Sequence, residues 1–289
     1  MENSDLRTVF VNGAYLPENE AQVSIFDRGF LFADGVYEVT TVVDGKLIGF
    51  DGHIERLQRS LNELGINLTV DREEMLTIHR ELIARNTIDQ GMIYLQITRG
   101  NPGDRDFAYP SAETSPTVVL FTQHKQVVDT AIEKTGLKVV SIEDLRWGRR
   151  DIKTVQLLYP SMAKMEAKAK GADDAWMVQD GHVTEGTSNN AYIVKDGVII
   201  TRPLSNDILH GITRRAVLNA AKLLQMKVEE RPFTLKEAYA ADEAFATSAS
   251  GFTNPIVEID GHTVGTGKPG PVADKLRETY LVESMKEAL

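Results

Sequence analysis

The sequence predicts an α+β protein of two domains, and three observations indicate this. Short β-branched runs surround turn dipeptides such as Asn12-Gly13 and Asp44-Gly45, which favours antiparallel hairpins. Helical runs interrupt these hairpins without the regular strand–helix alternation of a Rossmann fold. A polar, charged stretch at residues 123–135 separates two parts of ordinary domain size. We therefore expect an N-terminal α/β domain at residues 1–122, a connection at 123–135 and a C-terminal domain at 136–289.

The first part of the chain combines hairpin strands with two amphipathic helices. One helix is expected at residues 53–64, with apolar side chains on one side and Gly65 to end it. Asp71 is expected to cap a second helix that runs through Arg85. The expected strands cover residues 8–11, 14–16, 36–43, 46–50, 93–98 and 117–122.

The second part alternates short strands with helices and shows no internal repeat. Asp180-Gly181 and Asp196-Gly197 are typical of hairpin turns. The expected strands cover residues 137–142, 175–178, 183–184, 191–194, 198–201, 228–231, 244–247 and 256–259. The expected helices cover residues 159–170, 212–224, 235–240 and 271–286.

Composition narrows the class of protein. The 289 residues include 42% hydrophobic and 26% charged residues, which is ordinary for a globular chain. A net charge of −10 disfavours a nucleic-acid partner, and the lack of cysteine excludes disulfides and thiolate metal sites. The six histidines are scattered without ligand spacing. No signal-peptide pattern or membrane-spanning apolar run occurs, so a cytoplasmic protein is expected.

A lysine and a glutamate stand out as candidates for cofactor chemistry. Lys153 follows Asp151-Ile152 and precedes a predicted helix, and Glu185 lies in the polar run Val-Thr-Glu-Gly-Thr-Ser-Asn-Asn. A lysine amine can hold an aldehyde cofactor as a Schiff base, and a carboxylate can keep the ring nitrogen of that cofactor protonated. A lysine or a turn glutamate taken alone is more often a solvated surface residue. The assignment therefore depends on the motifs around these two residues.

Those motifs resemble the fold-type IV aminotransferases that use pyridoxal 5′-phosphate (PLP). The resemblance rests on the runs DIK, VTEGTSNN, LHGITRR and FATSAS, which occur in this order along the chain. The run DRGFLFADGVYEV is most similar to D-amino acid transaminases within that family. The resemblance implies a smaller N-terminal α/β domain and a barrel-like C-terminal α/β domain. It also implies a homodimer with the active site near the subunit interface.

The resemblance implies roles for the cofactor-binding residues. Lys153 would form the Schiff base and shuttle the proton as the catalytic residue, and Glu185 would pair with the ring nitrogen. Arg56 and the backbone at Ile212 and Thr213 would bind the phosphate. The remaining cofactor contacts implied by the resemblance are Ser188, Leu209, Arg146, Ser248, Ala249 and Ser250.

The substrate contacts are expected from Tyr37, Arg105, Phe107 and Arg28. The D-amino acid transaminases that this chain resembles bind the substrate carboxylate with an Arg-x-His pair after a Thr-Arg-Gly run. Arg105 takes the place of the arginine here, but Phe107 stands where the histidine is expected. Pairing of Arg105 with Asp104 or Asp106 is the structural alternative, and Arg28 is the second candidate for the carboxylate.

The resemblance implies a PLP-dependent transaminase that moves an amino group from a D-amino acid to a 2-oxo acid such as 2-oxoglutarate or pyruvate. Phe107 adds apolar surface, so activity on (R)-primary amines is also expected. Two alternatives stay open: a branched-chain L-amino acid transaminase, and a PLP lyase like aminodeoxychorismate lyase. The lyase would release pyruvate without an amino acceptor.

Overall fold

A computed structural model describes residues 6–289, which divide into two compact units. Unit 1 comprises the described residues through Val128 together with Ile152–Gln156 and Ala288–Leu289. Unit 2 comprises Asp129–Asp151 and Leu157–Glu287. The change of unit after Val128 lies inside the connection expected at 123–135. This stretch is partly regular, because strand β6 (Thr117–His124) and helix α4 (Ala131–Thr135) extend into it.

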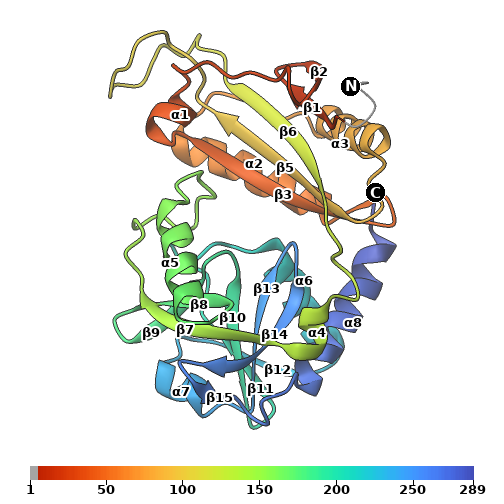
Figure 1. The fold of residues 1–289 in the computed structure, drawn as a ribbon, viewed down its shortest axis with the longest axis vertical. Helices are drawn as coiled ribbons and strands as arrows, with labels where there is room; N and C mark the ends of the chain where they lie inside the picture. The colour runs from red at the N-terminus through yellow and green to blue at the C-terminus, as the bar shows by residue number, and fades with distance from the viewer. Residues whose placement is uncertain (1–5) are drawn as a thin grey trace. The chain divides into compact units, whose positions relative to one another are not determined.

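Unit 1 is built on a six-stranded antiparallel sheet with the order β2-β1-β6-β5-β3-β4 (Figure 1). The predicted hairpin at Asn12-Gly13 is confirmed, since Val11 pairs with Ala14 across it. β5 lies between β3 and β6 and pairs with both along its whole length. The other strands of this sheet are β1 (Thr8–Val11), β2 (Ala14–Pro17), β3 (Gly35–Val43), β4 (Lys46–Ile48) and β5 (Gly91–Thr98).

Helices α2 (Phe50–Leu64) and α3 (Arg72–Asn86) pack on this sheet and complete one hydrophobic core. α2 starts three residues before its predicted start and ends at Gly65, whose φ of 62° favours glycine. Asp71 caps α3 as predicted, since its carboxylate accepts from the N–H groups of Glu73 and Glu74 at 2.9 Å. The five-residue helix α1 (Arg28–Phe32) was not predicted, because it is too short to show a helical period.

One buried histidine in this core, His79, is expected to make the stability of unit 1 depend on pH. Nδ1 of His79 donates to the Met75 carbonyl at 2.7 Å, and the ring packs edge-on against Phe50. Burial lowers the pKa of His79 from 6.5 to about 4. A histidine with a lowered folded-state pKa stabilises the fold above the unfolded pKa. That contribution is lost as the pH falls, because the unfolded chain binds the proton first.

We therefore expect the free energy of unfolding to fall by about 1.4 kcal/mol per pH unit from this group between about pH 6.5 and 4. Urea unfolding at several pH values measures this slope. His79→Leu should flatten the slope, whereas His124→Gln at the exposed end of β6 should leave it unchanged. An identical slope in wild type and His79→Leu would contradict the assignment.

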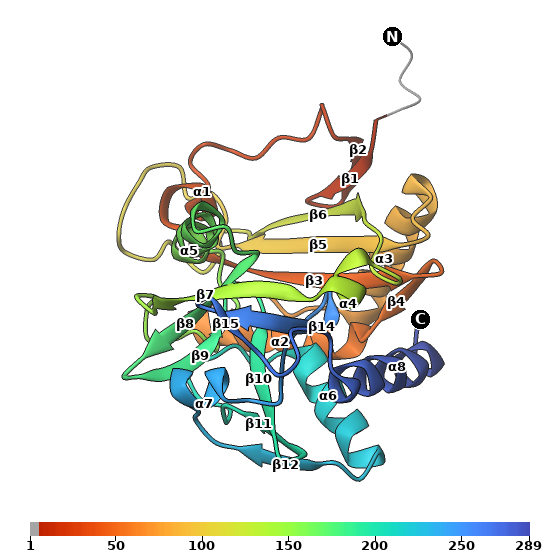
Figure 2. The same ribbon diagram turned by 60° about the horizontal axis from the view of Figure 1, so that its bottom comes forward.

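Unit 2 contains a nine-stranded mixed sheet with the path β12-β11-β10-β13-β14-β7-β8-β9, and β15 pairs with β14. The strands β7 and β14 run across β10 and β11 in Figure 2, because the sheet curls into a half-barrel. The barrel-like form implied by the resemblance is confirmed. The strands are β7 (Leu137–Glu143), β8 (Asp174–Gln179), β9 (His182–Gly186), β10 (Asn190–Lys195), β11 (Val198–Thr201), β12 (Lys227–Glu230), β13 (Glu243–Ser248), β14 (Phe252–Ile259) and β15 (His262–Thr263).

Helices connect two of the three parallel strand pairs of this sheet. β7 and β8 are parallel and are joined through α5 (Leu158–Ala169), and β11 and β12 are joined through α6 (Ile212–Leu223). The short helix α7 (Leu235–Tyr239) precedes β13, and α8 (Pro271–Lys286) closes the unit. β14 begins four residues earlier than predicted, and Pro255 lies inside it opposite Phe245. None of the helices that the structure describes is long and apolar enough to cross a membrane.

The predicted C-terminal domain differs from unit 2 at the segment that carries Lys153. Ile152–Gln156 belongs to unit 1 because its backbone pairs with the start of β3. Tyr37 donates its N–H to the Lys153 carbonyl, and Val155 donates to the Gly35 carbonyl, both at 3.0 Å. β4 pairs only with Thr41–Val43, so this edge of β3 is open to the Lys153 segment.

Candidate active site

The Lys153 side chain lies against an aromatic stack in unit 1. Its Nζ is 3.9 Å from the centroid of the Tyr37 ring. Tyr37 stacks on Tyr94 at 5.5 Å, and Tyr94 stacks on Phe121 at 4.9 Å. The backbone bonds to β3 fix the Lys153 main chain, and the stack gives its amine an aromatic face. The structure therefore brings together Lys153 and Tyr37, two residues that the sequence predicts at one site.

Arg56 is held by a buried carboxylate that the sequence analysis did not include. Its Nε donates to Oε1 of Glu38 at 2.8 Å, and its Nη2 donates to Oε2 at 2.7 Å. Nδ1 of His53 lies 2.7 Å from the same Oε2. Burial acts to raise the pKa of Glu38, but the charge of Arg56 and these hydrogen bonds outweigh it and lower the pKa to about 2. Glu38 therefore orients a guanidinium whose predicted partner is the phosphate.

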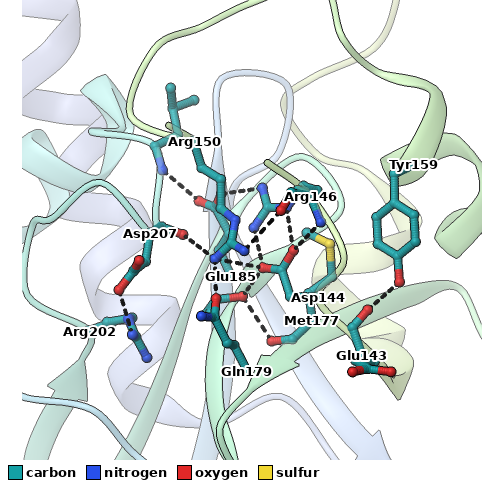
Figure 3. Close-up of polar contacts among 12 residues, drawn as sticks. Glu143, Asp144, Arg146, Arg150, Tyr159, Met177, Gln179, Glu185, Arg202 and Asp207 are labelled. Carbon is teal, nitrogen blue, oxygen red and sulfur yellow. Dashed lines mark hydrogen bonds and ion pairs between the residues drawn. The ribbon is translucent and has the colours of Figure 1, made fainter. Parts of the chain in front are cut away.

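Glu185 lies at the centre of a buried polar cluster in unit 2, shown in Figure 3. Its Oε1 accepts from Nη1 of Arg146 at 2.6 Å. Its Oε2 accepts from Nδ2 of Asn190 and from the N–H of Leu209, each at 3.0 Å. A carboxylate has about four acceptor positions. Three of them are used within the described residues, so one remains for the N–H of a ring.

Asp144 positions Arg146 beside Glu185. The Arg146 guanidinium donates from Nε to Oδ1 of Asp144 at 2.9 Å and from Nη2 to Oδ2 at 2.7 Å, and the hydroxyl of Thr184 donates to Oδ2 at 2.6 Å (Figure 3). Burial raises the pKa of Glu185 above its usual range, although Arg146 acts in the opposite direction. The Arg146 guanidinium favours the ionised form of this carboxylate, which is the form that pairs with a protonated nitrogen. These contacts suit Glu185 for pairing with a protonated nitrogen.

The start of α6 lies next to Glu185, because Asn190 connects the two. Nδ2 of Asn190 donates to both Glu185 and the Leu209 carbonyl. A Cβ at Gly211 would lie 2.2 Å from Oδ1 of Asn190, so only glycine allows this approach. Gly211, the N-cap of α6, makes no side-chain cap hydrogen bond, so the N–H groups at Ile212 and Thr213 in the first turn stay the predicted donors for an anion.

The remaining predicted cofactor contacts lie in the loops of unit 2. Ser248 ends β13, and Ala249 and Ser250 follow it in a partly exposed turn. Ser188 is exposed in the bend between β9 and β10. β10 pairs with β13 and with β11, the strand that precedes α6. These loops therefore connect strands of the sheet that carries Glu185. Their contacts with a cofactor stay predictions.

Three of the predicted substrate residues, Arg28, Arg105 and Phe107, lie together in unit 1, but Arg28 is already engaged. Arg28 is 4% exposed, and its guanidinium donates to Asp34 and to the carbonyls of Asp106 and Ala108. This is a poor arrangement for a substrate clamp, because the buried cation already holds protein acceptors. Phe107 is 76% exposed, and the Arg105 guanidinium lies over its ring at 4.8 Å. Within residues 6–289, neither Asp104 nor Asp106 forms an ion pair with Arg105.

Three partner carboxylates were missed from the sequence: Glu38, Asp144 and Asp34. The sequence contains a weak indication of Glu38. This residue alternates with Val36 and Thr40 on the buried face of β3, where a charged residue is unusual. The sequence also contains a weak indication of Asp144, because this residue directly follows a strand and stands two residues before Arg146. Asp34 had none beyond its place in a turn-like run. Among residues 6–289, no group of His, Cys, Asp or Glu side chains is arranged to hold a metal ion.

Comparison with known proteins shows that the chain is an aminotransferase. Residues 35–259 match the family described as amino-transferase class IV. The chain belongs to this family, which confirms the resemblance that its motifs indicate. It is 38% identical over 275 residues to a D-alanine aminotransferase of Staphylococcus aureus (strain MSSA476), covering 95% of this chain and 97% of the relative. A D-alanine aminotransferase of Bacillus licheniformis is 39% identical over 282 residues, covering 96% of this chain and 99% of the relative.

Solved structures agree with the fold. The branched-chain aminotransferase of the thermophilic archaeon Thermoproteus uzoniensis with norvaline superposes with a TM-score of 0.85 at 27% identity, covering 98% of this chain and 96% of that structure. A second branched-chain amino acid aminotransferase, complexed with N-(5′-phosphopyridoxyl)-L-glutamate, gives a TM-score of 0.87 at 27% identity. That match covers 98% of this chain and 95% of the solved structure.

Proposed function

We propose that this aminotransferase uses PLP to move an amino group from a D-amino acid to a 2-oxo acid such as 2-oxoglutarate or pyruvate, and that it also accepts (R)-primary amines. The observation that carries the proposal is the buried Glu185 carboxylate beside the uncapped start of α6. This arrangement offers one acceptor for a ring N–H and several donors for a phosphate within a single unit. The acceptor matches the ring nitrogen of PLP, and the donors match its phosphate group.

When bound, PLP supplies an aldehyde that condenses with amines and a protonated ring that accepts the electrons left by the departing α-proton. Glu185 would hold the ring nitrogen protonated, with Arg146 and Asn190 keeping the carboxylate in place. Ile212, Thr213 and the turn at Ser248 would donate to the phosphate, and we propose Arg56 as its cationic ligand.

Lys153 is proposed to have two roles, as the cofactor ligand and as the proton carrier. In the resting enzyme Nζ would hold the cofactor as a Schiff base, and when displaced by the donor Nζ would carry the α-proton. The backbone pairing with β3 keeps this amine in one place through both tasks. The Tyr37 ring, 3.9 Å from Nζ, restricts the directions from which a donor can approach.

The D-amino acid class is supported by the relatives that carry the D-alanine aminotransferase name. They are 38% and 39% identical to this chain over nearly their full length, whereas the branched-chain structures are 27% identical. We propose Arg105 as the ligand of the donor carboxylate, because its guanidinium is exposed and can form two parallel hydrogen bonds. Phe107 would provide the apolar surface for larger side chains and for amines that lack a carboxylate.

We also propose that the chain forms a homodimer. The start of unit 1 exposes large apolar side chains close together in the sequence, including Ile25 at 67% and Phe30 at 74%, which would supply apolar surface for a subunit interface. Light scattering distinguishes the 32.0 kDa chain from its dimer, and an active monomer would contradict this proposal. The cytoplasmic location expected from the sequence stays a prediction.

A panel of amino donors tests the proposed reaction. With 2-oxoglutarate or pyruvate as acceptor, D-alanine or D-glutamate should be the fastest donor, and (R)-1-phenylethylamine should react slowly. L-leucine should be poorer than the D-amino acids by about tenfold or more, which corresponds to 1.4 kcal/mol in transition-state binding. L-leucine as the fastest donor would instead indicate a branched-chain enzyme. Release of pyruvate from aminodeoxychorismate without any acceptor would indicate the lyase.

A further inference from the structure

The loop between β5 and β6, residues 99–116, carries both Arg105 and Phe107, and Arg28 of α1 binds its backbone. Nη1 of Arg28 donates to the Asp106 carbonyl at 2.6 Å and to the Ala108 carbonyl at 3.2 Å. These two carbonyls flank Phe107. A single buried guanidinium therefore fixes the backbone on both sides of the residue that departs from the family pattern.

Asp34 keeps Arg28 in this position and is itself fixed by a second arginine. Its Oδ2 accepts from Nε of Arg28 and from Nε of Arg99, both at 2.7 Å. Arg99 also donates to the carbonyls of Leu64 and Gly65 at the end of α2. Burial acts to raise the pKa of Asp34, but the bonds from the two arginines outweigh it and lower the pKa. The carboxylate is therefore ionised, and it links the loop to a core helix.

Aromatic rings lie between these arginines and Arg105. The Arg99 guanidinium lies 3.7 Å from the centroid of Tyr109, and that of Arg28 lies 4.5 Å from the centroid of Phe32. Phe32 packs edge-on against Phe107 at 5.4 Å. The Arg105 guanidinium then lies 5.0 Å from Phe32. Cations and rings alternate from the partly buried Asp34 to the exposed Arg105, and every member belongs to unit 1.

We propose that Arg28 is a positioning residue that sets the place of Arg105, and so the affinity for donors with a carboxylate, without binding the substrate itself. The inference rests on the proposed function of Arg105. Glutamine at position 28 is shorter, has two N–H donors in place of five, and cannot stack as a cation on Phe32. Lysine keeps the charge beside Asp34, but its single ammonium lacks the planar fork that spans Asp34 and the two carbonyls.

A double-mutant cycle with D-alanine as donor tests this proposal. Arg28→Gln should raise KM about tenfold while kcat changes little, because positioning affects carboxylate binding and leaves Lys153 in place. Arg105→Ala should raise KM by about ten- to a hundredfold, since a charge-assisted pair is lost. Arg28→Gln should then cause no further rise in the Arg105→Ala background. The control Arg85→Gln removes an exposed arginine that also stacks on a ring, Tyr15, and should match wild type.

The double-mutant cycle separates a positioning role of Arg28 from a purely structural one. Equal effects of Arg28→Gln in the presence and absence of Arg105 would show that Arg28 acts only on the fold, and the inference would be wrong. A fall in kcat with an unchanged KM would contradict it as well. If Arg28→Gln gives no folded protein, Arg28→Lys replaces it in the same cycle. Failure of wild type to transaminate any D-amino acid would contradict the proposed function, which is a separate outcome.

Discussion

Lys153→Ala is expected to lower turnover by about a thousandfold or more, because the proposed Schiff base and the proton carrier are the same amine. The fold should persist. The Lys153 segment is held to β3 by backbone hydrogen bonds from Tyr37 and to Gly35, and alanine keeps both. The side chain is only half-buried, so its truncation leaves no large cavity. Turnover of D-alanine and thermal unfolding, measured on the same preparation, separate the two effects.

The matched control is Lys170→Ala, which removes an exposed lysine paired with Glu166 at the end of α5. It should retain wild-type turnover. Small primary amines added to Lys153→Ala should restore part of the activity, because a free amine can carry the α-proton in place of Nζ. Turnover near the wild-type rate in Lys153→Ala would show that another group performs the proton transfer.

Glu185→Gln should slow the first half-reaction by about a hundredfold or more, with PLP still bound. The amide is neutral and cannot keep a ring nitrogen protonated. It also fits poorly, because both carboxylate oxygens face donors: Arg146 on one side, Asn190 and the Leu209 N–H on the other. The NH₂ group of glutamine meets a donor in either orientation, which should lower the free energy of unfolding by about 1–3 kcal/mol.

Stopped-flow absorbance with D-alanine measures the half-reaction, and urea unfolding measures the stability. Glu258→Gln is the control, since Glu258 forms a partly exposed ion pair with Lys138 in the same sheet. It should change neither quantity appreciably. A half-reaction of wild-type speed in Glu185→Gln would remove the proposed role of this carboxylate, whatever its effect on stability.

Local sequence patterns were sufficient for most elements of the fold. Asn12-Gly13, Asp180-Gly181 and Asp196-Gly197 specify hairpins by themselves, since both residues of each pair adopt positive φ. The Asp71 cap likewise depends on residues within one turn of α3. The unit to which Ile152–Gln156 belongs depends instead on contacts between distant parts of the chain, and no local pattern encodes it.

The same distinction applies to the candidate site. Lys153, Glu185 and the start of α6 lie in contiguous motifs, so their candidacy was visible in the sequence. The Glu38–Arg56 pair was not, because it forms between β3 and α2. The Asp34–Arg28 pair is local, but Asp34 also binds the distant Arg99, which no local pattern indicates. Arg28 shows the consequence, since a surface-like arginine in the sequence is a buried structural cation.

The most direct test of the account is borohydride reduction of the purified, PLP-loaded enzyme followed by peptide mapping. A Schiff base absorbs near the visible edge, and reduction removes that band while fixing the pyridoxyl group to the lysine that carries it. We expect the band to disappear and the label to lie on Lys153 alone. A label on any other lysine, or no label with the band unchanged, would contradict the assignment of Lys153 as the residue that holds the cofactor.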